Sequence, residues 1–203
     1  MSQRKYSLKF LLKTRKVKMK IPISWYSIIA TFFFVGKFPG IPGTVGSLSC
    51  YPLYYLIIHY SQAISEVYNK FYMLLALLTL LATIAINQFQ KVTNTCDHSY
   101  IVIDEVIGQM LTLAISLEWL IYIKHNLSFL LGYDYYSIIF LISFLLFRYF
   151  DIRKPFIIGY INNKMKTPLG VILDDILAAF GASGVIFIIY KCLLLYNNFI
   201  VSC

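Results

Sequence analysis

The stretch Phe71–Gln90, FYMLLALLTLLATIAINQFQ, contains twenty residues and no charged side chain. An α-helix needs about 20 consecutive apolar residues to cross the hydrocarbon core of a bilayer. The whole chain is rich in apolar residues and poor in charge, since 59% of its 203 residues are hydrophobic and 13% are charged. A soluble domain carries roughly 25% charged residues. Long apolar runs without a polar face at helical or strand period do not suit a soluble core, so the sequence predicts an integral membrane protein.

Five apolar segments are candidates for membrane-spanning helices, at residues 45–64, 71–91, 101–123, 135–150 and 168–195. Pro52 interrupts the first segment, and we expect it to kink that helix or to delay its start. A sixth apolar stretch, at 22–35, has only about 14 residues and is expected to be interfacial or re-entrant rather than spanning. The predicted fold class is all-α: a polytopic membrane helix bundle with about five transmembrane helices and a short N-terminal interfacial or re-entrant segment.

The positive charges predict how these helices are oriented. Eight of the 18 Lys and Arg residues lie in the first twenty positions, and such a run beside a membrane is typical of an anchor to anionic lipid. A nucleic-acid-binding arm is the less direct interpretation. If 1–44 is cytoplasmic and the five helices alternate, fifteen of the 18 basic residues lie inside, in agreement with the positive-inside rule. We therefore expect a basic cytoplasmic tail at 1–21 and a membrane-embedded domain at 22–203, with loops 92–100 and 151–167 inside.

Six of the nine acidic residues fall at or near the predicted inner ends of helices: Asp97, Asp104, Glu105, Asp151, Asp174 and Asp175. A carboxylate within a membrane segment costs on the order of 3 kcal/mol or more and is retained mainly for function. Pairing with a nearby base would explain a single acid. The adjacent pairs 104–105 and 174–175 would instead repel one another unless a cation lay among them. Ligands that offer only oxygen suit Mg²⁺.

The twelve residues Gly36–Ser47, GKFPGIPGTVGS, contain four of the ten glycines and precede an apolar segment. Glycine lets the backbone turn its N–H groups toward one point, and Thr44 or Ser47 could cap a helix that begins there. A helix N-terminus exposed in this way binds anions. A flexible loop that leads into the membrane explains the pattern equally well, so both interpretations stay open at this point.

A third group of charges stands at the end of the fourth apolar segment, in 148–155, RYFDIRKP. Arg148 and Asp151 are three residues apart and therefore share a helix face. Basic residues beside a carboxylate suit a site for phosphate and metal, although alone they would indicate only a basic stop after a membrane helix. Together, the three groups predict a site for a phosphorylated lipid whose headgroup faces the cytoplasm.

Four motifs now stand in order along the chain: GKFPGIPGTVGSL at 36–48, IDEVIGQ at 103–109, FRYFDIRKP at 147–155 and GVILDD at 170–175. They resemble the motifs of the bacterial phosphatidylglycerophosphatase A family. The resemblance implies a Mg²⁺-dependent phosphatase of the bacterial inner (cytoplasmic) membrane, multi-pass, with its active site facing the cytoplasm. Such an enzyme converts phosphatidylglycerophosphate to phosphatidylglycerol and phosphate in phospholipid biosynthesis. Its partners would be that lipid in the cytoplasmic leaflet and other membrane lipids, with no nucleic acid.

Carried onto this sequence, the resemblance implies a role for each motif. The predicted metal ligands are Asp104, Glu105, Asp174 and Asp175, and the predicted catalytic residues are Asp104, Asp151, Asp174 and Lys154. Asp151 would be a further ligand or the general base. The predicted phosphate-binding residues are Lys37, Gly43, Thr44, Gly46, Ser47, Arg148 and Lys154.

Two departures from the family pattern concern the last predicted helix. Thr167-Pro168 stands where two glycines are usual, and Ala178-Ala179 stands where Ala-Gly is usual. Proline fits a first helical turn, so we expect the change to affect a phosphate contact of the loop rather than the acids.

The competing hypothesis is a non-enzymatic membrane cation carrier or channel that uses interfacial carboxylates. Such a protein would place acids near the bilayer midplane and at several depths. Here the acids gather at one predicted interface, which favours the enzyme.

Overall fold

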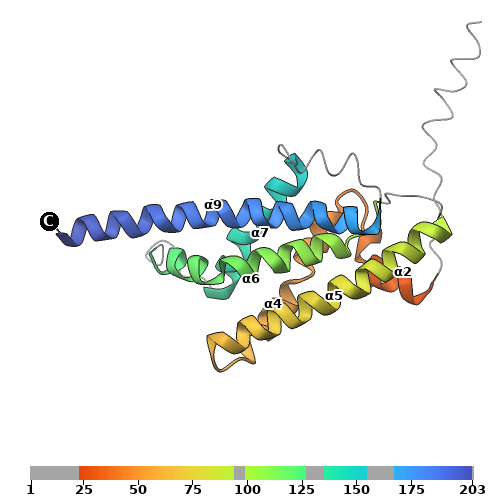
Figure 1. Ribbon diagram of the computed structural model, residues 1–203, viewed down its shortest axis with the longest axis horizontal. Coiled ribbons are helices and arrows are strands. Elements are labelled where there is room, and N and C mark those ends of the chain that lie inside the picture. Colours follow the sequence, from red (N-terminus) through yellow and green to blue (C-terminus); the bar gives the residue numbers. More distant parts are fainter. Residues whose placement is uncertain (1–22, 94–98, 127–134, 155–166, 203) are drawn as a thin grey trace, which may run out of the picture.

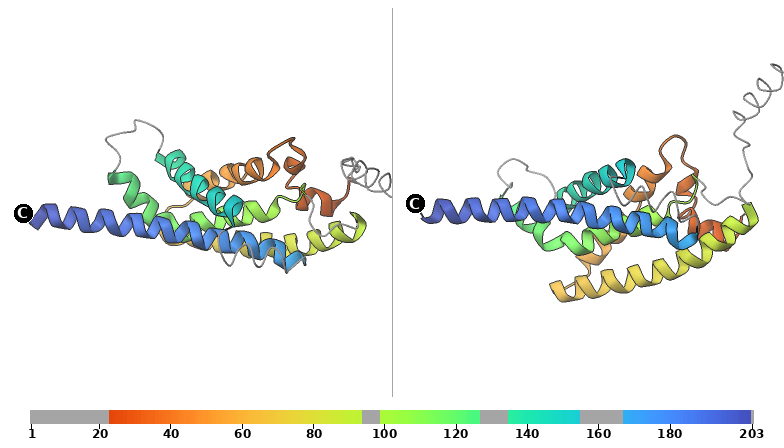
Figure 2. Two further views of the ribbon diagram at one scale, coloured as in Figure 1. Left: turned by 90° about the horizontal axis from the view of Figure 1, so that it is seen from above. Right: turned by 45° about the horizontal axis from the view of Figure 1, so that its top comes forward.

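The computed structural model describes residues 23–93, 99–126, 135–154 and 167–202, and every regular element within these ranges is a helix. In chain order the helices are α2 (Trp25–Ala30), η1 (Val35–Lys37), α3 (Pro42–Leu48), α4 (Tyr51–His59), α5 (Ile64–Thr93), α6 (Ile103–Asn126), α7 (Tyr135–Arg153) and α9 (Pro168–Ser202). The predicted all-α class is confirmed. Helices α5, α6 and α9 run along the length of the molecule, with α6 between the other two (Figure 1). Helix α7 crosses α9 obliquely (Figure 2).

Within the described residues, three helices are long and apolar enough to cross a membrane: Ile64–Thr93, Ile103–Asn126 and Pro168–Ile200. They correspond to the second, third and fifth predicted spans. The fourth predicted span coincides with α7, which is 19 residues long, and its crossing of the membrane stays a prediction. The predicted basic tail at 1–21 and Asp97 lie outside the described residues.

The first predicted span, 45–64, is not one continuous helix. The chain forms α3 and α4 instead, seven and nine residues long, and neither alone reaches the length of a membrane span. Pro52 explains the break, because a proline ring clashes with the carbonyl group four residues earlier, which here belongs to Leu48, the last residue of α3. The sequence predicted a kink or a late start at Pro52, whereas the structure has two helices, and Pro52 occupies the first turn of the second.

The N-terminal apolar stretch contains only the six-residue helix α2, in agreement with the prediction that it does not span. Directly after it, Phe32, Phe33 and Phe34 have φ values of 41°, 54° and 67°, so the chain turns back through a left-handed conformation. The N–H of Val102 donates to the Ala30 carbonyl at 3.0 Å. This bond fixes the end of α2 beside the start of α6.

Helix α6 lies at the centre of the bundle, in contact with α3, α5, α7 and α9. Two of its polar side chains bond to other helices: Gln109 Nε2 donates to Ser143 Oγ at 2.9 Å, and Ser116 Oγ donates to Ser183 Oγ at 2.9 Å. A side chain at Gly108 would place its Cβ 2.6 Å from the Phe147 ring, so the glycine permits the close approach of α7. A helix that is mostly apolar around its whole circumference belongs in such a buried position.

Candidate functional site

The N-terminal parts of α6 and α9 bring together three carboxylates, which we call the carboxylate trio: Asp104, Glu105 and Asp175. One oxygen of each lies within 4.8 Å of the others. Asp104 and Asp175 are only 8% and 4% exposed. Among the described residues, Asp104 Oδ1 and Glu105 Oε2 are buried without a hydrogen-bond partner. An unpaired buried carboxylate oxygen carries a large desolvation cost, so the trio has the chemistry of a cation site.

The local sequence explains why α6 can begin with two acids. Asp104 and Glu105 lie in the first turn of α6, where the free N–H groups and the helix dipole favour negative charge. The trio therefore combines two carboxylates stabilised by the start of one helix with a third from α9.

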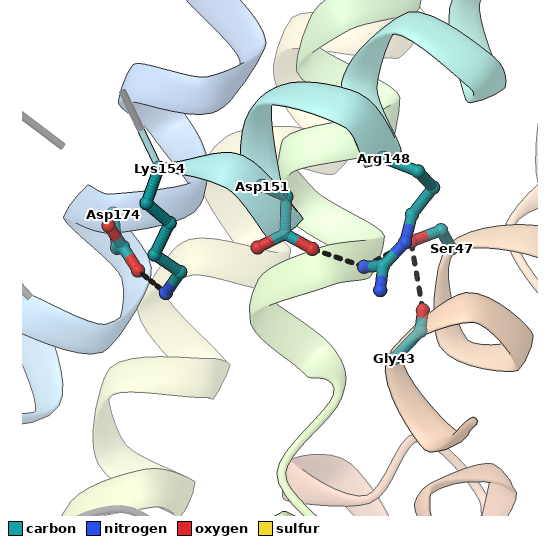
Figure 3. Close-up of polar contacts among 6 residues, drawn as sticks. All are labelled: Gly43, Ser47, Arg148, Asp151, Lys154 and Asp174. Carbon is teal, nitrogen blue, oxygen red and sulfur yellow. Dashed lines mark hydrogen bonds and ion pairs between the residues drawn. The ribbon is translucent and has the colours of Figure 1, made fainter. Parts of the chain in front are cut away.

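The end of α7 adds an ion pair beside the trio, between Arg148 and Asp151 (Figure 3). Asp151 is 8% exposed, and its charge acts on all three members of the trio. Arg148 Nη1 also lies 3.5 Å from Ser47 Oγ of α3. Arg148 Nε is buried without a hydrogen-bond partner among the described residues. Arg148 thus connects α7 to the glycine-rich segment and keeps one donor unused.

Lys154 follows directly after α7 and forms an ion pair with Asp174 of α9 (Figure 3). Its φ of 43° ends the helix with a left-handed residue, a common way to stop an α-helix. Burial lowers the pKa of Lys154, but the bonded Asp174 carboxylate, with Asp175 and Asp151 nearby, raises it above its ordinary value overall. Lys154 is therefore protonated at neutral pH.

These residues form one charged cluster: Asp104, Glu105, Asp151, Asp174, Asp175, Arg148 and Lys154. It contains five carboxylates and two basic side chains. Each basic side chain is bonded to a carboxylate outside the trio, so the excess negative charge falls on the trio. Of the four predicted metal ligands, Asp174 is the one that the structure pairs with a base instead.

The glycine-rich segment approaches the charged cluster closely. A Cβ added at Gly43 would overlap Glu105 Oε1 and lie 3.3 Å from Arg148 Nη1. A Cβ at Gly46 would lie 2.8 Å from Val102 Cβ. These glycines are therefore required for the contact between α3 and the start of α6, a role that the sequence had not indicated.

The predicted caps of this segment are wrong. Helix α3 begins at Pro42, its N-cap is Ile41, and no side chain caps it. Proline fixes φ at a helical value and is favoured in the first turn, so α3 starts before Thr44. Ser47 lies in its last turn and donates to the Gly43 carbonyl at 2.9 Å.

Of the predicted phosphate-binding residues, Gly46 lies against Val102, and the other six fall into two groups. Gly43, Ser47, Arg148 and Lys154 lie in or against the charged cluster. Lys37 is exposed, with its Nζ 4.0 Å from the centre of the Phe34 ring. Among the described residues, the hydrogen bonds and ion pairs of the charged cluster involve neither Lys37 nor Thr44.

Thr167, which the sequence analysis treated only as a departure from a pattern, caps α9. The N–H of Gly170 donates to Thr167 Oγ1 at 3.2 Å, and Pro168 is the first residue of the helix. A threonine followed by proline is a typical N-terminal signal for a helix, so the residue types alone could have identified it. The cap fixes the start of the helix that carries Asp174 and Asp175.

Comparison with known proteins shows the family of the chain. The family model described as Phosphatidylglycerophosphatase A matches residues 28–190. The Phosphatidylglycerophosphatase A of Haemophilus influenzae is 30% identical over 179 residues, which cover 86% of this chain and 93% of the relative. That of Escherichia coli K12 is 27% identical over 179 residues, with 86% and 88% covered. No solved structure matches the chain. The matched region includes every residue of the charged cluster.

Proposed function

Because the chain belongs to the phosphatidylglycerophosphatase A family, we propose that it hydrolyses the phosphomonoester of phosphatidylglycerophosphate to phosphatidylglycerol and inorganic phosphate. The observation that carries the proposal is the charged cluster, in which a buried carboxylate trio lies beside Arg148 and Lys154. The cluster lies toward one end of helices that are apolar enough to cross a membrane. A lipid phosphate at the bilayer surface can reach such a position. The alternative, a cation carrier, has no support in the family match or in the two relatives.

The proposed cofactor is Mg²⁺, held by Asp104, Glu105 and Asp175. Three carboxylates offer only hard oxygen ligands, which this ion prefers, and two of their buried oxygens have no partner among the described residues. A divalent cation bound there would supply Lewis-acid polarisation of the phosphate ester.

The side chains of α7 and the residue after it are proposed to bind the phosphate group. The buried Nε–H group of Arg148 has no hydrogen-bond acceptor among the described residues. A guanidinium binds phosphate oxygens with two parallel hydrogen bonds. Lys154 adds a second positive charge against the charge that develops on the phosphoryl oxygens. Their partners Asp151 and Asp174 hold these two bases in place. Asp151, which acts on every member of the trio, is proposed as a further ligand or as the general base.

The membrane placement follows the distribution of positive charge. We propose a multi-pass protein of the inner membrane, with the charged cluster and the basic tail at 1–21 on the cytoplasmic side. Most basic residues then lie on the cytoplasmic side, and the protein binds the headgroup of a lipid in the cytoplasmic leaflet.

The test is a phosphate-release assay with purified protein in detergent and phosphatidylglycerophosphate as substrate. Turnover should require a divalent cation, stop with EDTA and return with Mg²⁺. Asp175→Asn should abolish it, while Glu66→Gln is the matched control, because Glu66 is an exposed acid paired with Lys70 on α5. A folded wild-type protein that releases no phosphate from this lipid with any divalent cation would exclude the proposed activity.

A further inference from the structure

A groove of about 530 Å³ lies between α5, α6 and α9, next to the charged cluster. One side is a face of α5 between Leu75 and Ile84, and the other side is formed by Ile107 and Leu111 of α6 and Ile176 of α9. Ile176 directly follows Asp175, and Ile107 lies three residues after Asp104. The groove therefore adjoins the helix turns that carry the carboxylate trio.

The sequence of α5 explains why the groove exists and why it is apolar. Its lining positions include the small residues Ala76, Thr79 and Thr83, which leave room that larger side chains would fill. Thr83 Oγ1 donates to the Thr79 carbonyl at 2.8 Å, so this hydroxyl is already bonded within the helix. Helix α5 also separates from α6 and α9 toward its own N-terminal end (Figure 1).

The groove is open toward the outside of the bundle. Leu80 and Ile84 are 61% and 46% exposed. Only 28% of the most apolar stretch of α5 is buried inside the molecule, against 67% of the corresponding stretch of α6. A molecule in the bilayer can therefore enter the groove sideways from the membrane.

The α5 side of the groove is about as long as one leaflet is thick, whereas the facing residues of α6, Ile107 and Leu111, are about one helical turn apart. Helices α5 and α6 follow each other in an antiparallel arrangement, so Ile84 lies at the end near the charged cluster and Leu75 at the far end. The nine steps between them rise about 14 Å at 1.5 Å per residue. Half of a ~30 Å hydrocarbon core is about 15 Å. A chain that starts at the charged cluster and fills the groove would thus cross one leaflet.

Because the charged cluster adjoins an apolar groove whose α5 side is as long as one leaflet, we infer that the groove holds one acyl chain of the lipid substrate. The inference rests on the proposed function and adds a residue-level site for the apolar part of the molecule. The groove positions the headgroup, because a chain seated along α5 limits where the phosphate can lie.

The test compares chain lengths in a variant that fills the far end of the groove. Ala76→Phe should lower kcat/KM for the dioleoyl substrate at least about tenfold, the lower end of the effect of one methylene-sized contact in an apolar pocket. The dihexanoyl substrate, whose chains are shorter than the groove, should change less than about twofold. Leu77→Phe is the matched control, since Leu77 is 52% exposed on the same helix and does not line the groove.

A second measurement on the wild-type chain does not depend on turnover or on the variant's folding. A phosphatidylglycerophosphate analogue with a diazirine at the end of one acyl chain should cross-link to α5 around Leu75–Leu80. Unlabelled phosphatidylglycerophosphate should compete, and phosphatidylcholine should not.

The outcomes separate the two proposals. Turnover of the dihexanoyl lipid by the wild type supports the proposed function whether or not the groove binds an acyl chain. The groove assignment fails if Ala76→Phe and Leu77→Phe give the same chain-length profile, or if the cross-link lies elsewhere. Equal competition by phosphatidylcholine would identify an ordinary membrane lipid as the occupant, and cross-linking of α5 to α5 of a second copy would identify a dimer contact. Either result also overturns the inference.

Discussion

Replacing Asp104 with asparagine should abolish turnover without weakening the metal-free protein. Two charged carboxylate oxygens at 4.8 Å, the largest separation within the trio, repel by about 3.5 kcal/mol at an effective dielectric constant of about 20. Closer pairs repel more strongly, and proton uptake relieves part of the repulsion. Asp104→Asn removes one charge from two of the three pairs in the trio. Unfolding without metal should therefore occur at the same temperature as in the wild type or at a higher one.

The same substitution should remove the stabilisation that the metal provides. A ligand at a hundred times its Kd stabilises the folded state by about 2.7 kcal/mol, so wild-type Tm should rise with Mg²⁺ and the Tm of Asp104→Asn should not. Asp174→Asn is the comparison, because Asp174 is bonded to Lys154. Breaking a buried pair by removing one partner destabilises a protein, so this variant should lose Tm with and without metal.

The assay is thermal unfolding in detergent, with EDTA or Mg²⁺, alongside phosphate release. The reasoning fails if Asp104→Asn lowers the metal-free Tm markedly and retains activity, since the trio would then be a structural network. It also fails if Asp104→Asn and Asp174→Asn behave alike in all conditions.

Three further predictions concern the elements around the charged cluster. Gly43→Ala should lower turnover at least tenfold and cost about 1–3 kcal/mol of stability, as overpacking does. Gly184→Ala is the control, because an added Cβ there meets nothing within 4 Å, and it should leave turnover unchanged. Equal effects of the two substitutions would contradict the assigned contact of Gly43. Thr167→Ala should lower stability by about 1 kcal/mol through loss of the α9 cap, Thr167→Ser should restore it, and denaturant unfolding measures both. A cysteine at Asn126, in an otherwise cysteine-free chain, should be labelled only from outside intact cells, and labelling from the cytoplasm would refute the topology.

Much of this protein could be predicted from local sequence. Apolar runs of the length of Phe71–Gln90 predict membrane helices because backbone groups in lipid must be bonded within the same segment. The positions of α5, α6 and α9 followed from hydropathy, and a disturbance at Pro52, though not the division into α3 and α4, followed from ring geometry. The types and order of the charged residues, together with the resemblance that their motifs carry, pointed to the family to which the chain belongs.

The tertiary structure decided how the charged residues are divided. Asp174 and Asp175 are adjacent, and neighbouring residues on a helix point about 100° apart, so both could not face the same site equally. The packing of α9 against α6 turns Asp175 toward Asp104 and Glu105 and leaves Asp174 to Lys154. The contact of Gly43 with Glu105, and the groove beside the trio, likewise depend on how closely separate helices approach. Sequence patterns along one helix fix which residues share its face, but the partner of that face is set by helices distant in the chain.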